Sequence, residues 1–212
     1  MENFALSVQR FDEFAQEYAQ RYMDIGAYAD SIDRFFNLIP SKHPSILELA
    51  CGPGNVTRIM AERFPESKIT ALDLAPNMIA IARKHLPEVD FRIMDVRDVL
   101  SLSQKFDAVM CSFCLPFLSK KDTSRLIADC AVLLESKGVI YISTMEGDES
   151  KAGFEPTRFS GQTPVYFNYH RQQDIEKALT EAGFEIVHLK LQDYHEPDGS
   201  LTIDMIFIGR KT

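Results

Sequence analysis

An acidic residue and two glycines stand close together near the start of the chain. Glu48 lies within an apolar run, and Gly52 and Gly54 follow where that run ends. Glycine has no Cβ and can take positive φ, so a ligand can approach its backbone, and a helix that follows would point free N–H groups at the same place. Glu48 would repel a pyrophosphate but could bind an ammonium group, directly or through water. These residues predict a site for a nucleoside joined to an amino acid.

Two phosphate-binding motifs fit less well. The dinucleotide fingerprint Gly-x-Gly-x-x-Gly has its third glycine where this chain has Thr57. A Walker A loop needs a lysine that the segment after Gly54 does not contain. A nicotinamide-dependent oxidoreductase therefore stays only as a less favoured alternative.

Two further acids follow the next strand-like segments. Asp73 lies 19 positions after Gly54, the separation at which a carboxylate at the next strand end can accept hydrogen bonds from both ribose hydroxyls. Asp95 could accept from the exocyclic amine of a purine. Neighbouring residues offer an apolar surface for the purine and a backbone donor for its ring: Leu74, Met78 and Val96. Each acid alone is equally consistent with a helix or turn cap, but together with the glycines they indicate an adenosine pocket.

The order of these motifs resembles the class I S-adenosylmethionine-dependent methyltransferases. The first motif of that family, an acid followed by Gly-x-Gly, is similar to residues 48–54, and its second and third strands are similar to residues 69–73 and 91–96. The resemblance implies S-adenosyl-L-methionine as cofactor. The implied cofactor-binding residues are Glu48, Ala50, Gly52, Gly54, Asp73, Leu74, Met78, Asp95, Val96 and Cys111, with Tyr18 and Tyr22 as candidates from an N-terminal lid.

Strand-like and helical segments alternate along the chain, which predicts an α/β fold with a Rossmann-like three-layer αβα sandwich. Seven strands are expected at residues 45–49, 68–74, 89–94, 106–111, 138–145, 184–191 and 201–209. Helices are expected at residues 56–64, 78–85 and 122–134, the last with Asp122 as N-cap, and another begins at residues 172–174.

The link between the last two strands contains Pro-Asp-Gly at residues 197–199 and is too short for a crossover helix. The final strand should therefore be antiparallel. In the resembled family this strand lies beside the fifth, which implies the strand order 3-2-1-4-5-7-6.

Composition indicates a single soluble domain over residues 1–212. We divide it into an N-terminal helical lid (1–40), a cofactor-binding core (41–145), a substrate-side insertion (146–171) and a C-terminal helix with a β-hairpin (172–212). The net charge of −8 argues against nucleic acid as a partner. No signal peptide or apolar run of membrane-spanning length is evident, so we expect a cytoplasmic protein without a membrane partner. The oligomeric state stays open.

Four cysteines lie in or beside apolar segments, as reduced buried thiols do: Cys51, Cys111, Cys114 and Cys130. We expect no disulfide. Cys111 and Cys114 form a C-x-x-C spacing, but a second ligand pair for zinc is missing, and no metal is expected.

Aromatic residues recur at helical spacing before the first strand: Phe11, Phe14, Tyr18 and Tyr22. In the resembled family such a helix often covers the cofactor and the substrate, and ordinary packing on the sheet is the alternative.

The acceptor should contact loops at the carboxyl ends of the strands. Candidates after the fourth strand are Phe113 and Phe117, and the aromatic-rich insertion adds Tyr166. Tyr169 and His170 are the candidate catalytic residues, with His170 as a proton acceptor, although such a histidine more often caps a helix.

These features imply methyl transfer to a small-molecule acceptor by in-line displacement, catalysed mainly by proximity and orientation. A non-catalytic S-adenosylmethionine-binding protein would keep the same cofactor residues and is the main alternative.

Overall fold

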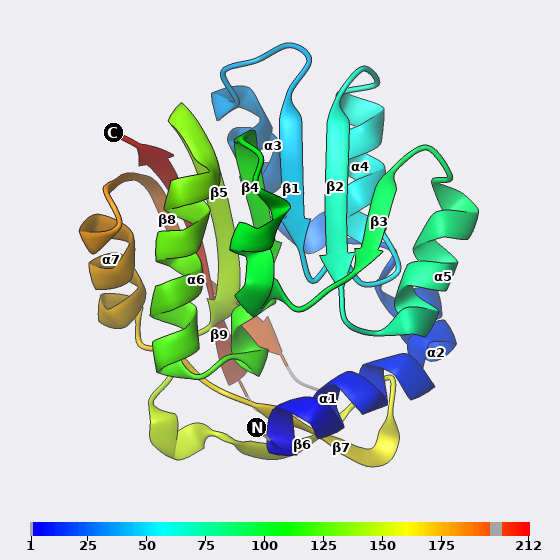
Figure 1. The fold of residues 1–212 in the computed structure, drawn as a ribbon. Coiled ribbons are helices and arrows are strands. Elements are labelled where there is room, and N and C mark those ends of the chain that lie inside the picture. Colours follow the sequence, from blue (N-terminus) through cyan, green and yellow to red (C-terminus); the bar gives the residue numbers. More distant parts are fainter. Residues whose placement is uncertain (1, 196–200) are drawn as a thin grey trace.

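A twisted seven-stranded sheet forms the centre of the molecule in the computed structural model, which describes residues 2–195 and 201–212 (Figure 1). Its strands are β1 (Ser45–Leu49), β2 (Lys68–Asp73), β3 (Asp90–Ile93), β4 (Phe106–Ser112), β5 (Leu134–Met145), β8 (Phe184–His195) and β9 (Leu201–Lys211). The order is β3-β2-β1-β4-β5-β9-β8. Counted within this sheet alone, that is the expected order 3-2-1-4-5-7-6.

Strand direction also agrees with the sequence. The five strands from β1 to β5 pair in parallel, whereas β9 is antiparallel to both β5 and β8. The reversed strand therefore lies beside the fifth, as predicted. The Pro-Asp-Gly segment of the link lies outside the described residues.

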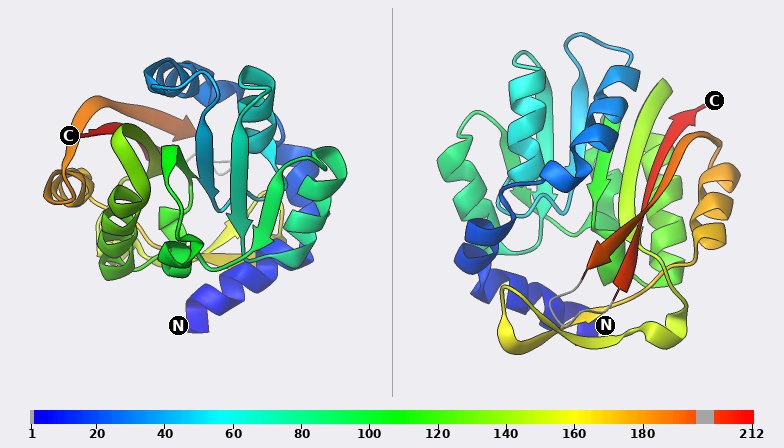
Figure 2. Two further views of the ribbon diagram at one scale, coloured as in Figure 1. Left: turned by 45° about the horizontal axis from the view of Figure 1, so that its top comes forward. Right: turned by 180° about the vertical axis from the view of Figure 1, so that it is seen from behind.

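Helices cover both faces of the sheet, as Figure 2 shows. One face packs against α3 (Ala29–Leu38), α4 (Asn55–Arg63) and α5 (Pro76–His85). The other packs against the 3-10 segment η2 (Val96–Leu102), α6 (Lys120–Leu133) and α7 (Gln172–Glu181). Because the central strands β1, β4, β5 and β9 have apolar residues on both sides, burial between two helical layers stabilises the sheet. The three-layer arrangement is confirmed.

Two separate segments cover the carboxyl ends of the parallel strands (Figure 1). One comprises α1 (Glu2–Glu13) and α2 (Ala15–Tyr22), and the other is a hairpin of β6 (Gly153–Thr157) and β7 (Gly161–Phe167). The Ser7 hydroxyl donates to the Tyr166 carbonyl at 3.0 Å and accepts from its N–H at 3.1 Å, which joins the two. We call α1, α2 and this hairpin the roof.

Asp12 connects the roof to α5, in the helical layer on one face of the sheet. Its carboxylate accepts from the backbone N–H of Asn77 at 2.6 Å, in the first turn of α5, where helical N–H groups lack intrahelical partners. The roof is therefore held together by Ser7 and attached to α5 by Asp12.

Several boundaries differ from those expected. Helix α6 begins at Lys120 because Ser119, and not Asp122, is its N-cap: the Ser119 hydroxyl accepts from the Asp122 N–H at 3.1 Å. The expected N-terminal aromatic helix is broken at Phe14, where ψ is 27°. The β6–β7 hairpin was not predicted, since its alternation is short and interrupted by proline.

Short connecting elements complete the described chain: η1 (Gly26–Tyr28), η3 (Leu115–Phe117) and η4 (Glu149–Lys151). The four cysteines are buried free thiols, as expected. Within the described residues, no helix combines the length and apolar character needed to span a membrane.

Candidate functional site

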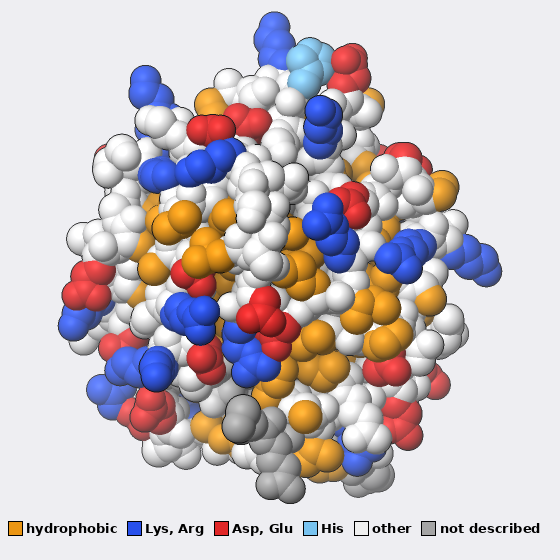
Figure 3. Space-filling view, in the orientation of Figure 1, with side chains coloured by type: hydrophobic (Ala, Val, Ile, Leu, Met, Phe, Trp, Pro, Cys, Tyr) orange, Lys and Arg blue, Asp and Glu red, His pale blue; other side chains and the backbone are white. Residues whose placement is uncertain are grey.

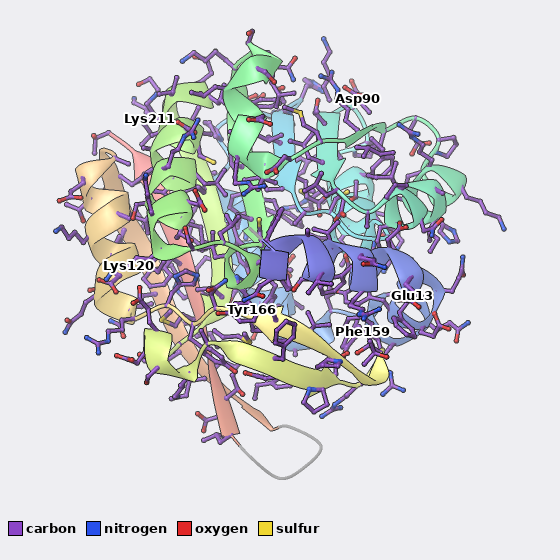
Figure 4. All side chains as sticks on the ribbon, turned by 60° about the horizontal axis from the view of Figure 1, so that its bottom comes forward. Glu13, Asp90, Lys120, Phe159, Tyr166 and Lys211 are labelled. Atoms are coloured by element: carbon purple, nitrogen blue, oxygen red, sulfur yellow. The ribbon has the colours of Figure 1, made fainter. Side chains whose placement is uncertain are left out.

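A cavity of about 1220 Å³ lies between the roof and the carboxyl edge of the sheet. Residues at the ends of β1, β2, β4, β5 and β9 line it, together with roof residues such as Tyr18 and Phe159. Figure 4 views this edge and shows α1 and the hairpin lying across it. A pocket for one small ligand is usually about 300–1,000 Å³, so this cavity is larger than one such ligand requires.

The predicted nucleoside site lies at the β1–β2 end of the cavity. The Gly52 N–H donates to Oδ2 of Asp73 at 2.8 Å, and the Ala75 N–H donates to Oδ1 at 2.9 Å. Burial raises the pKa of Asp73, and these backbone donors act in the opposite direction. Both carboxylate oxygens are thus oriented by the backbone and retain lone pairs for hydroxyl donors.

The loop after β1 takes left-handed backbone conformations at the predicted glycines. The φ angles of Gly52 and Gly54 are 55° and 86°, and Ala50, a non-glycine residue, has a φ of 54°. A Cβ on Gly52 would lie 3.8 Å from the ring of Tyr18, so it would project into the space between the loop and the roof. The glycine keeps this space open for a ligand.

Glu48 is almost completely buried, with 2 % of its surface exposed, yet it lines the cavity. The Thr57 hydroxyl donates to its carboxylate. Burial raises the pKa of Glu48 to about 8, because the hydrogen bond from Thr57 only partly offsets the loss of solvation. A cationic group that entered the cavity would favour the charged form.

Most of the predicted cofactor residues meet in this cavity. Those that line it are Tyr18, Tyr22, Glu48, Ala50, Gly52, Asp73, Leu74, Met78 and Val96. Gly54 is the N-cap of α4, beneath the loop. The candidates Phe113 and Phe117 also line it.

Asp95 and Cys111 are placed differently. The Asp95 carboxylate accepts from the Arg97 backbone N–H at 2.9 Å and from its guanidinium, so it caps η2 and forms an ion pair. The guanidinium and hydrogen bonds hold the pKa of Asp95 below its usual value despite partial burial. Cys111 is buried in the core, and the thiol on the cavity wall is that of Cys114.

The position of His170 does not favour the catalytic role predicted for it. Its imidazole is 3 % exposed, lies outside the cavity wall, and has Nε2 at 2.8 Å from the carbonyl oxygen of Leu115. Burial lowers the pKa of His170, because it disfavours the charged imidazolium. The ring therefore connects the segment between β7 and α7 to η3.

Tyr166 likewise does not contact the cavity: its ring packs edge-on against Phe154, with centroids 5.2 Å apart. Tyr169 does line the cavity, and its hydroxyl donates to Glu155 at 2.9 Å.

Several lining residues were not predicted. Phe159 sits at the hairpin turn (Figure 4), and its ring lies 5.0 Å from Phe11 and 5.2 Å from Tyr18. Tyr28 donates to Asp204 at 2.7 Å on the opposite side of the cavity. No local motif marks either group, since their partners are distant in the chain.

Charges on the outer surface are mixed. Lysine and arginine side chains alternate with acidic ones over the face in Figure 3. Over residues 2–195 and 201–212, no group of three or more His, Cys, Asp or Glu side chains is arranged to hold a metal ion.

Comparison with known proteins places these features in context. Residues 46–138 match the family model described as a methyltransferase domain. Demethylmenaquinone methyltransferase from Thermotoga maritima is 26% identical over 204 residues, covering 85% of this chain and 88% of that protein. Trans-aconitate 2-methyltransferase from Escherichia coli O7:K1 is 30% identical over 175 residues, covering 76% and 65%. The chain spans 47% of a malonyl-[acyl-carrier protein] O-methyltransferase from Acetivibrio thermocellus, at 28% identity.

Solved structures share the fold. A methyltransferase from Clostridium acetobutylicum superposes with a TM-score of 0.70 at 16% identity, covering 95% of this chain and 98% of that one. The amino pentose methyltransferase CalS10 from Micromonospora echinaspora, solved with S-adenosylmethionine bound, gives a TM-score of 0.67 at 21% identity, covering 88% and 91%.

Proposed function

We propose, from the premise that this chain belongs to the class I S-adenosylmethionine-dependent methyltransferases, that the cavity under the roof holds the cofactor at the β1–β2 end and a small-molecule acceptor at the β5–β9 end. The observation that carries this assignment is the arrangement of Glu48, Gly52 and Asp73 on adjacent strand ends. Glu48 suits an ammonium group and the doubly oriented Asp73 suits two vicinal hydroxyls, which matches the two ends of an adenosyl amino acid.

When bound, S-adenosylmethionine would supply a methyl group on a positively charged sulfur, and the sulfur is the leaving group when a nucleophile attacks the methyl carbon in line. The chain contributes positioning and exclusion of water. Asp73 and the Gly52 loop would hold the nucleoside, and Val96, Met94 and Phe117 provide an apolar wall. The roof closes the cavity over them through Phe11, Tyr18 and Phe159, whose rings contact one another.

The size of the cavity supports transfer over binding alone. A non-catalytic binder needs room only for the cofactor, whereas residues beyond β4 extend this cavity past Phe113 to Met145 and Asp204. The acceptor of this chain is a small molecule in this proposal, as the names of its relatives suggest for those proteins.

Calorimetric titration with S-adenosylhomocysteine and S-adenosylmethionine, with NAD as control, tests the assignment. Micromolar binding of both adenosyl ligands, and clearly weaker binding in Asp73→Ala, is expected. Binding of NAD instead, or equal affinity in the variant, would overturn it.

A further inference from the structure

The most buried charged residues that line the cavity are acidic. The basic ones, Arg21, Lys151 and Arg158, are all exposed. Two of the acids, Glu48 and Asp204, are only 2 % and 3 % exposed. The inner surface of the cavity therefore favours groups with positive charge.

Asp204 lies too far from the nucleoside end to serve the same ligand group as Glu48. The strand order separates β1 from β9 by β4 and β5, which is three strand spacings or about 14 Å. Asp204 pairs in register with Met145, at the end of β5, and Phe113 follows β4 between the two acids. Asp204 thus belongs to the acceptor end.

Aromatic side chains lie close to Asp204. The Tyr28 hydroxyl donates to its Oδ2 at 2.7 Å, and the Tyr28 ring packs edge-on against Phe113 at 5.3 Å between centroids. Tyr194, on β8, also lines the cavity and is near enough to influence Tyr28, and the Arg158 guanidinium lies 5.8 Å from the centroid of its ring. A carboxylate bordered by aromatic rings is an arrangement that binds ammonium groups, through charge and through the ring faces.

Burial, and next the charge of Asp204, raise the pKa of Tyr28, because a phenolate there would face a carboxylate. Tyr28 therefore keeps its proton and orients Asp204.

We infer that the methyl acceptor is an amine whose ammonium group binds Asp204, with Tyr28 as the positioning residue for this carboxylate. The inference rests on the proposed function. The ammonium gives one proton to Asp204, the freed nitrogen lone pair forms a bond to the methyl carbon, and the carbon–sulfur bond breaks with its electron pair going to sulfur. The product is the methylated ammonium together with the neutral thioether.

Three probes with the same ring and different head groups test the charge preference: benzylamine, benzyl alcohol and benzoate. Each is titrated calorimetrically into the S-adenosylhomocysteine complex of the full chain. Benzylamine is expected to bind in the millimolar range, and the alcohol and the acid at least about tenfold more weakly, because they lack the charge-assisted bond.

Variants then locate the binding site. Asp204→Asn keeps an oxygen that can accept from Tyr28 and should weaken benzylamine by about tenfold or more. Tyr28→Phe keeps the ring and should weaken it less. Asp193→Asn removes the same charge from an exposed position on β8 and should leave benzylamine affinity unchanged.

Affinity for S-adenosylhomocysteine, measured in every variant, reports folding and tests the cofactor assignment separately. Retained cofactor binding without benzylamine binding, tighter binding of benzoate or benzyl alcohol, or equal affinity of Asp204→Asn for benzylamine would each overturn the amine inference alone. If Asp204→Asn fails to fold, Tyr28→Phe decides: unchanged benzylamine affinity in that variant overturns the inference. Mass-spectrometric detection of N-methylbenzylamine would support the transfer step.

Discussion

Thr57 donates its hydroxyl to the buried carboxylate of Glu48, nine positions earlier in the chain. Thr57 occupies the position of the third glycine in a dinucleotide fingerprint. The same threonine that argues against a dinucleotide site therefore also provides the hydrogen-bond donor for Glu48.

Stability should depend on pH through Glu48. The pKa of about 8 in the folded protein lies above the ordinary value of 4.5, so the folded state binds a proton more tightly than the unfolded state. Between these two values the free energy of unfolding therefore falls as pH rises. Glu48→Gln removes this loss, so its melting temperature relative to the parent protein should be higher at about pH 9 than at about pH 5.

Thermal denaturation of both proteins at the two pH values measures the effect. Glu88→Gln, at an exposed position, is the matched control and should show the same pH dependence as the parent. A parallel pH dependence for Glu48→Gln and the parent would contradict the raised pKa.

Asp73→Ala should weaken S-adenosylhomocysteine by about 2–3 kcal/mol, the scale of hydrogen bonds to a charged group. Asp95→Ala should cause a smaller loss, because the Asp95 carboxylate is engaged by Arg97 outside the cavity wall. Calorimetry on both variants compares the two acids. A larger effect of Asp95→Ala would restore Asp95 as the principal adenosine-binding acid.

Gly52→Ala should reduce both stability and cofactor affinity. The positive φ of 55° strains any side chain by about 1 kcal/mol, and the added methyl would project toward Tyr18 across the ligand space. Gly183→Ala provides the matched control, because its φ is 85° and it lies after α7, away from the cavity. The melting temperature of Gly183→Ala should fall similarly, while its affinity for S-adenosylhomocysteine stays unchanged. Equal affinity in the two variants would contradict a ligand position next to Gly52.

His170→Gln should lower stability without lowering cofactor affinity. The loss of the bond to Leu115 should cost about 1–3 kcal/mol at about pH 8. Because burial lowers the pKa of His170, its stabilising contribution is present above the ordinary value of 6.5 and is lost as pH falls. The difference from the parent should therefore shrink at about pH 5.

Denaturant unfolding at the two pH values measures this difference, with the exposed His85→Gln as control. A weakened affinity of His170→Gln for S-adenosylhomocysteine, with unchanged stability, would indicate that this histidine contributes to ligand binding.

The strand order followed from the family resemblance, whereas the sequence by itself predicted the reversed last strand and the residues that meet at the β1–β2 end of the cavity. These depend on short-range patterns: Gly52 needs positive φ, Asp73 ends the strand next to Glu48, and a short link leaves no room for a helix. Each pattern fixes a local geometry whatever the rest of the chain does.

Only the tertiary structure decided which side chains reach the acceptor end. Asp204 and Tyr28 are 176 positions apart, and Phe159 meets Phe11 only because the unpredicted hairpin packs against α1. The residue type of His170 and its place in the sequence are suited to catalysis, but its ring is buried against Leu115, outside the wall of the cavity. Such contacts depend on how segments distant in the sequence pack together. Local residue types and spacings do not determine this packing.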